Sequence, residues 1–100
     1  MKESLNYEDF LNSLKNEHPS ELWPKVLQAL WYDAKGNWNA SHDITQDIHS
    51  DLGFWMHAYL HRKEGDKFNA DYWYGRANKP YPNNTLQEEF RILVDYVINN

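Results

Sequence analysis

The sequence predicts an all-α fold, a compact bundle of about six helices that forms one domain over residues 1–100. Three observations support this prediction. Apolar residues recur every three or four positions in each long segment, which is the period of a helix with one buried face. Glycines, prolines and capping residues separate these segments at short intervals. No segment shows the strict alternation of apolar and polar residues that is typical of a half-buried strand.

The first two predicted helices lie in the N-terminal third of the chain. The first follows a cap at Asn6, and its apolar stripe consists of Tyr7, Phe10, Leu11 and Leu14. The segment His18-Pro19-Ser20 ends it. The same segment opens the second helix, which runs to about Lys35; Pro24 is acceptable in it because amides of the first turn lack partners within the helix. Its apolar face is broad enough to be buried on more than one side: Trp23, Val26, Leu27, Leu30, Trp31 and Ala34.

The middle of the chain is predicted to form two more helices. A third, more polar helix is expected from about Trp38 to His49, with Ser41, Ile44, Thr45 and Ile48 on its inner face. A fourth begins at a cap formed by Ser50-Asp51 and ends at Glu64. We expect the fourth helix to be central because two neighbouring stripes of it are apolar or aromatic: Leu52, Trp55 and Tyr59, and beside them Phe54, Ala58 and His61.

A tight turn and a loop delimit the last two predicted helices. Gly65 should close the fourth helix in the left-handed conformation, and Asp66 should cap the fifth. The fifth helix carries Phe68, Tyr72, Trp73 and Ala77 and stops in the loop 78–84, which contains two prolines. In the sixth helix, Thr85 and Glu88 have the spacing of a capping box, and the buried residues would be Leu86, Phe90, Leu93, Val94 and Val97.

A weak internal repeat relates the two glycine turns. Gly36 and Gly65 are 29 positions apart, since 65 minus 36 is 29, and the small residues Ser41 and Ala70 each follow five positions later. A glycine at the turn and small residues where helices cross are typical of the second-helix half of a tetratricopeptide or Sel1-like repeat, although such repeats are usually ~34 residues long. We therefore predict two tetratricopeptide-like helical hairpins within the bundle.

Two longer segments also resemble known sequences. They are ALWYDAKGNWNASHDITQDI, from Ala29 to Ile48, and WMHAYLHRKEGDKFNADYWYGRA, from Trp55 to Ala77. Both are similar to an uncharacterised family of small bacterial helical proteins with the pattern W-x-H-A-Y-L-H-R-x-E-G-D-x-x-N-A-x-Y-W-Y-x-R-A. The resemblance covers about half of the chain. It implies a helical fold and a bacterial origin, and it carries over no catalytic residue.

Composition and charge restrict the classes of partner. The formal net charge of −5 disfavours contact with a phosphate backbone, so no nucleic acid is expected as a partner. Without cysteine the chain has no disulfide framework, thiol nucleophile or thiolate metal site. No segment contains the ~20 apolar residues that cross a bilayer, and the segment MKESLNYEDFLNSL is unlike a secretory signal. We therefore expect a cytoplasmic protein with no membrane partner, and no motif implies a cofactor.

Four of the five histidines lie within twenty residues. On a helix, His57 and His61 are i, i+4 neighbours with Glu64 one turn beyond, which can place two imidazoles on one metal ion beside a carboxylate. The H-E-x-x-H pattern is absent and spacing along the chain fixes no third ligand, so we predict no metal site. The simplest interpretation is that these histidines join helices through hydrogen bonds. The alternative is a binding groove that they share with His42.

Two arginines and a tryptophan complete this candidate groove. Arg62 and Arg76 are close in sequence to aromatic residues, so each guanidinium can stack on a ring, bind a ligand carboxylate or pair with an acidic residue of the chain. The candidate ligand-binding residues are His42, His57, His61, Glu64, Arg62, Trp73 and Arg76. The predicted function is a small helical-repeat-like binding or scaffold module for another protein or a small molecule. The alternative is a small hydrolase or metal-binding protein that uses the histidine and carboxylate side chains, with no catalytic residue assigned.

Overall fold

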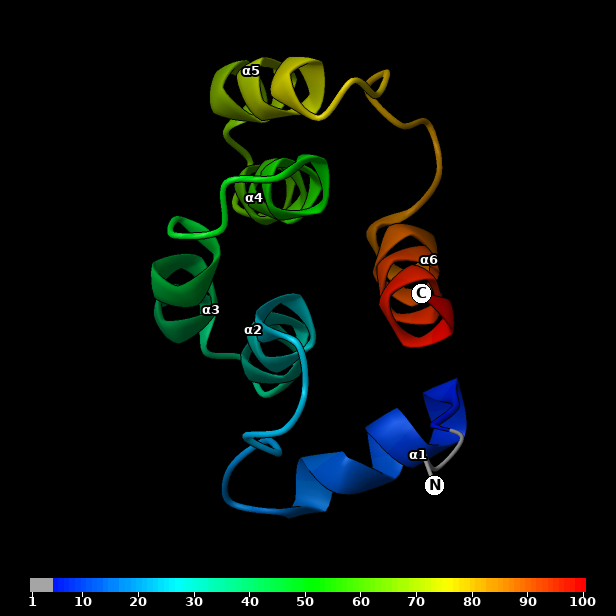
Figure 1. The fold of residues 1–100 in the computed structure, drawn as a ribbon. Coiled ribbons are helices and arrows are strands. Elements are labelled where there is room, and N and C mark those ends of the chain that lie inside the picture. The colour runs from blue at the N-terminus through cyan, green and yellow to red at the C-terminus, as the bar shows by residue number, and fades with distance from the viewer. Residues whose placement is uncertain (1–4) are drawn as a thin grey trace.

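The computed structural model describes residues 5–100, and over that range it contains six α-helices and no strand (Figure 1). The helices are α1 (Tyr7–Asn12), α2 (Lys25–Ala34), α3 (Trp38–Thr45), α4 (Asp51–Lys63), α5 (Lys67–Arg76) and α6 (Leu86–Asn99), and a short 3-10 helix, η1 (Ser13–Lys15), continues α1. The predicted all-α bundle is confirmed. Residues 1–4 lie outside the described residues, and so does that part of the segment expected not to be a secretory signal.

The helices pack as two hairpins with α6 on their inner side. The hairpin α2–α3 lies beside the hairpin α4–α5, and α6 packs across α2 and α4, with α1 against its other flank (Figure 1). As expected, α4 is central, since it contacts α2, α3, α5 and α6. The core is dominated by large rings, of which Phe10, Trp31, Tyr59 and Tyr74 are almost wholly buried. Within residues 5–100, no helix is both long and apolar enough to span a membrane.

The two hairpins use the same turn. Gly36 and Gly65 adopt φ values of +83° and +88°, and in both turns the next residue caps the following helix with its side chain. Asn37 accepts a hydrogen bond from the amide of Ala40, and Asp66 accepts one from the amide of Asn69. The predicted left-handed conformation of Gly65 is therefore confirmed, and the same turn and cap recur 29 residues apart.

Substitution by alanine at two of the glycines should affect stability differently. Gly65→Ala should destabilise the protein by about 1 kcal/mol, because a β-carbon is strained at positive φ. Gly75→Ala should be neutral or stabilising by up to about 1 kcal/mol, since Gly75 lies in α5 with nothing within 4 Å of an added β-carbon. The urea midpoints of the two variants test this. Equal shifts in the same direction would contradict the role assigned to the turn.

The third helix is shorter than the sequence predicts. It ends at Thr45 rather than near His49, and the amide of Ile48 then bonds the carbonyl of Thr45 at 3.0 Å in a tighter turn. The chain reverses here so closely that a β-carbon on Gly53 would lie 2.1 Å from the carbonyl oxygen of Ile48. The helix must end early because α4 begins at once and passes against the turn.

Two aromatic residues of α5 lie on the surface. Phe68 is 84% exposed and Tyr72 is half exposed, whereas Ala70, Tyr74 and Ala77 are buried. These two residues are exposed because α5 lies at the edge of the bundle and packs mainly on α4 (Figure 1). Apolar spacing locates a helix face, but the number of neighbouring helices decides how much of that face is buried.

Candidate binding site

The structure brings three histidines together between α3 and α4. His42 comes from α3, while His57 and His61 lie one turn apart on α4. The Nε2 atoms of His42 and His57 are 3.1 Å apart, and the ring centroid of His61 lies 5.0 Å from that of His57 and 5.5 Å from that of His42. We call this group the histidine cluster. The three rings lie close together, as a shared binding groove would require. The contact between His42 and His57 also fits the simpler interpretation, in which histidines join helices through hydrogen bonds.

Two tryptophans fix the planes of these rings. Trp38 stacks on His42 at a centroid distance of 4.8 Å, and Trp73 from α5 stacks on His57 at 4.0 Å. The indole of Trp38 is itself held, because its Nε1 donates a hydrogen bond of 2.9 Å to the carbonyl of Leu60. Stacked rings with fixed neighbours lose little further freedom on binding, so the histidine cluster is preorganised.

Two of the other predicted groove residues lie near the histidine cluster, and one does not. Glu64 lies beside the cluster, with its Oε2 atom 2.7 Å from Nδ1 of His61. Arg76 stacks over Phe54, and together with His57 and Trp73 these side chains line a cavity of about 350 Å³. Arg62 is not part of this group.

Arg62 extends toward α6 instead. Its Nη1 atom donates a hydrogen bond of 2.8 Å to the carboxylate of Glu89. The internal pairing considered for this arginine is therefore present, but with Glu89 and not with Glu64, Asp66 or Asp71, its nearer neighbours in the sequence.

The surroundings lower the pKa of two of the clustered imidazoles, those of His42 and His57. Burial, followed by the nearby His42 and His61, lowers the pKa of His57 to about 4. Burial and His61 also lower the pKa of His42. Neutral imidazoles offer lone pairs, which makes them ligands for cations and acceptors for hydrogen-bond donors.

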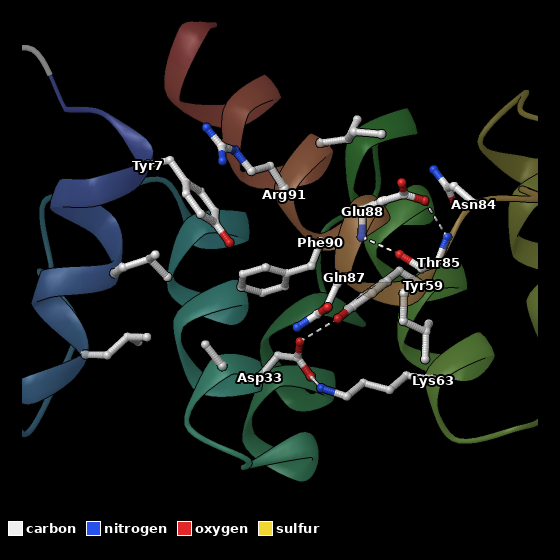
Figure 2. A pocket seen from close by; sticks show the side chains of 15 residues that line it. Tyr7, Asp33, Tyr59, Lys63, Asn84, Thr85, Gln87, Glu88, Phe90 and Arg91 are labelled. Atoms are coloured by element: carbon white, nitrogen blue, oxygen red, sulfur yellow. Dashed lines mark hydrogen bonds and ion pairs between the residues drawn. The ribbon is translucent and has the colours of Figure 1, made fainter.

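A larger cavity lies on the other side of the molecule's central helix. It has a volume of about 1070 Å³ and is bounded by α1, η1, α2, α4 and α6 (Figure 2). Its walls are mainly apolar and aromatic, with Tyr7, Leu11, Leu14, Ala34, Tyr59, Leu86, Phe90 and Ile92. Its polar lining residues are Asp33, Lys63, Asn84, Thr85, Gln87, Glu88 and Arg91. We call it the inner cavity.

A buried carboxylate forms part of the lining of the inner cavity. Asp33 is only 3% exposed and accepts hydrogen bonds from the hydroxyl of Tyr59 at 2.9 Å and from Nζ of Lys63 at 2.8 Å (Figure 2). Burial and the adjacent Asp33 raise the pKa of Tyr59, so the phenol remains a proton donor. These contacts join α2 to α4.

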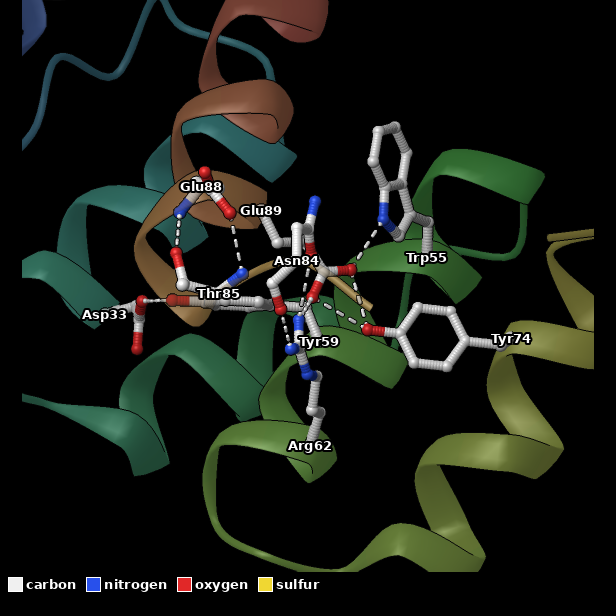
Figure 3. Close-up of polar contacts among 9 residues, drawn as sticks. All are labelled: Asp33, Trp55, Tyr59, Arg62, Tyr74, Asn84, Thr85, Glu88 and Glu89. Carbon is white, nitrogen blue, oxygen red and sulfur yellow. Dashed lines mark hydrogen bonds and ion pairs between the residues drawn. The ribbon is translucent and has the colours of Figure 1, made fainter. Parts of the chain in front are cut away.

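A second buried carboxylate joins three helices. Glu89 of α6 is 2% exposed and accepts hydrogen bonds from Nε1 of Trp55 at 3.1 Å and from the hydroxyl of Tyr74 at 2.6 Å (Figure 3). Arg62 supplies the positive charge that compensates it and also bonds Asn84 in the loop before α6. Each donor is matched to a carboxylate oxygen, as a buried charge requires.

Sequence reasoning missed both carboxylates, although their spacing contained a signal. Glu89 falls three residues after Leu86 and four before Leu93, and therefore on the buried stripe of α6. Asp33 likewise falls three residues after Leu30. A charged residue at an apolar position of a helix indicates a buried partner, but it does not say on which helix that partner lies.

Comparison of the chain with family models, with curated proteins and with solved structures found no match in any of the three. The tetratricopeptide or Sel1-like relation of the hairpins stays a prediction. The function is therefore inferred from the arrangement of the residues themselves.

Proposed function

We propose that this protein is a small helical-repeat-like binding module whose inner cavity holds a segment of a partner protein. The observation that carries the proposal is the cavity of about 1070 Å³, with mainly apolar walls and a rim of polar side chains. Ligand pockets commonly have volumes of about 300–1,000 Å³ and combine apolar walls with a few polar groups. The inner helices α2 and α4 of the two hairpins both contribute to its walls, as expected for a tetratricopeptide-like module.

The charges that solvent can reach at this cavity favour an acidic partner segment. The side chains of Lys63 and Arg91 are 40% and 58% exposed, whereas the side chain of Asp33 is 2% exposed. Glu88 is also exposed, and it accepts a hydrogen bond of 2.8 Å from the amide of Thr85 in the cap of α6. Lys63 and Arg91 each have one acidic partner, Asp33 and Asp95, and keep further donors exposed to solvent for the carboxylates of a bound segment. A segment with apolar and acidic side chains fits both the walls and the rim.

A bacterial origin belongs to the same proposal. It is supported only by the sequence resemblance to small bacterial helical proteins described above. The cytoplasmic location stays a prediction, and so does a role as a scaffold, which would need a second partner on another face.

The proposal is tested with a library of short fluorescent peptides composed of Leu, Phe, Ser and Glu. We expect fluorescence anisotropy to find peptides that bind the full chain, and the same peptides with Lys in place of Glu to bind at least 10-fold more weakly, which is ~1.4 kcal/mol. Arg91→Gln should weaken binding and reduce its dependence on salt.

A matched pair of variants locates the bound peptide. Ile92→Asp places an acidic group on the wall of the inner cavity and should weaken binding strongly. Leu22→Asp makes the same kind of change at a residue that is 95% exposed and lies outside the lining, so binding should persist. Equal binding by both variants, or a library without any binder, would exclude the inner cavity as the site.

A further inference from the structure

We propose that His42, His57 and His61 form a binding site for a divalent transition-metal ion of the Zn²⁺ class, with Glu64 orienting His61. Within residues 5–100, these three side chains each offer a ring nitrogen, and the three nitrogens all lie within 4.8 Å of one another. None of the three lines the inner cavity. The inference therefore stands independently of the proposed function.

The spacing of the nitrogens is close to that of a metal centre. Zn–N bonds of about 2.0–2.1 Å at tetrahedral angles place ligand nitrogens about 3.4 Å apart. The Nε2 atoms of His42 and His57 are 3.1 Å apart, which is already near this spacing. The third nitrogen lies within 4.8 Å of both, so it has to move by no more than ~1.5 Å, which side-chain rotation of His61 can provide.

A direct hydrogen bond between His42 and His57 accounts for only part of this arrangement. One proton shared between two Nε2 atoms uses the lone pair of one ring and does not involve the ring of His61. A bound cation would take the place of that proton, which would move to Nδ1 of the ring that carried it, and would use one lone pair of each of the three imidazoles. Neutral imidazole is the form that binds a metal.

Glu64 supplies the outer contact that metal-bound histidines usually make. Its Oε2 atom is 2.7 Å from Nδ1 of His61, which holds the proton on that nitrogen and leaves the lone pair on Nε2. Trp38 and Trp73 perform a comparable task for His42 and His57 by fixing their ring planes. The cluster thus has three ligands whose orientations are each supported by a neighbour.

The donor set selects the class of metal. Three imidazole nitrogens suit Zn²⁺, Cu²⁺ or Ni²⁺, whereas Mg²⁺ and Ca²⁺ prefer oxygen ligands. Three protein ligands leave the fourth tetrahedral position to water or to a further ligand. Of the three ligands, His57 also lines the cavity of about 350 Å³.

Titration of the chelator-treated full chain with ZnCl₂ alone tests the site. We expect isothermal titration calorimetry to give one Zn²⁺ per chain, and thermal unfolding to shift upward with added Zn²⁺. Co²⁺ bound in its place should show the visible absorption of tetrahedral coordination. MgCl₂ at the same concentration should produce neither effect.

Matched histidine variants decide whether the cluster is responsible. His61→Gln and His42→Gln should each weaken Zn²⁺ binding at least 100-fold, and Glu64→Gln should weaken it by roughly 10–100-fold. His49→Gln changes an exposed histidine outside the cluster and should bind as the parent does. His57 is buried and the side chain of His61 is only 12% exposed, so circular dichroism must first show that the histidine variants are folded. Parent-like binding by the His42 and His61 variants, or no binding by the parent, would overturn the proposal.

Discussion

Glu89→Ala should lower the free energy of unfolding by roughly 3–5 kcal/mol, the cost of removing one partner from a buried charge pair. The substitution would leave the guanidinium of Arg62 without its counter-charge, although its side chain is only 13% exposed. It would also leave the hydroxyl of Tyr74 and the indole of Trp55 without an acceptor. Urea unfolding followed by tryptophan fluorescence measures the loss.

Two further variants identify the cause of this loss. Gln87→Ala changes an exposed residue on the same helix and should alter stability by less than about 0.5 kcal/mol. Glu89→Gln keeps an acceptor for one donor but loses the charge, so its cost should lie between the other two. If Glu89→Gln were as stable as the parent, the ion pair with Arg62 would contribute nothing and the hydrogen bonds alone would matter.

Acidification should destabilise the metal-free protein by about 3 kcal/mol between pH 6.5 and pH 4. Burial, together with His42 and His61, lowers the pKa of His57 from 6.5 to about 4. Between about pH 6.5 and pH 4, His57 is therefore protonated in the unfolded chain but not in the folded chain. The free energy of unfolding falls by up to ~1.36 kcal/mol for each pH unit in this range. The stabilisation is complete above pH 6.5 and is lost as the pH falls through this window. Urea unfolding in the presence of a chelator, at several pH values, measures it.

The contribution of His57 can be separated from that of the carboxylates. The neighbouring His42 also has a lowered pKa, because burial and His61 lower it more than Asp43 and Glu64 raise it. The pH dependence of stability therefore contains contributions from more than one group. His57→Gln should remove most of the slope between pH 6.5 and pH 4. His18→Gln, which changes an exposed histidine in the loop before α2, should keep it. A full slope in the His57 variant would assign the effect to other groups.

Local chemistry explains which parts of the fold could be predicted. Gly65 and the capping box of Thr85 and Glu88 act within a few residues of the chain, and both have the predicted geometry. The end of α3 could not be predicted, because it depends on how closely Gly53 passes Ile48. The exposure of Phe68 likewise depends on which helices lie beside α5.

The candidate site shows the same division. The pairing of His57 with His61 follows from helical spacing, but the approach of His42 follows from the packing of α3 on α4. Its position near aromatic residues in the sequence predicts that Arg62 belongs to the groove with the histidines. Its partner in the structure, Glu89, lies 27 positions away. Contacts between distant residues require the tertiary arrangement, which a single sequence specifies only through the balance of all its packing.

The contacts of Glu89 also bear on the lifetime of the folded protein. The turns at Gly36 and Gly65 close between adjacent helices, whereas Glu89 reaches Trp55 across 34 positions. Local contacts form at a smaller entropic cost than distant ones, so we expect the two hairpins to assemble before α6 docks on them. Interactions that form late restrain unfolding more than they accelerate folding. The contacts of Glu89 would then mainly set the rate at which α6 detaches from the two hairpins, and so how often the surfaces of α2 and α4 beneath it become exposed to solvent.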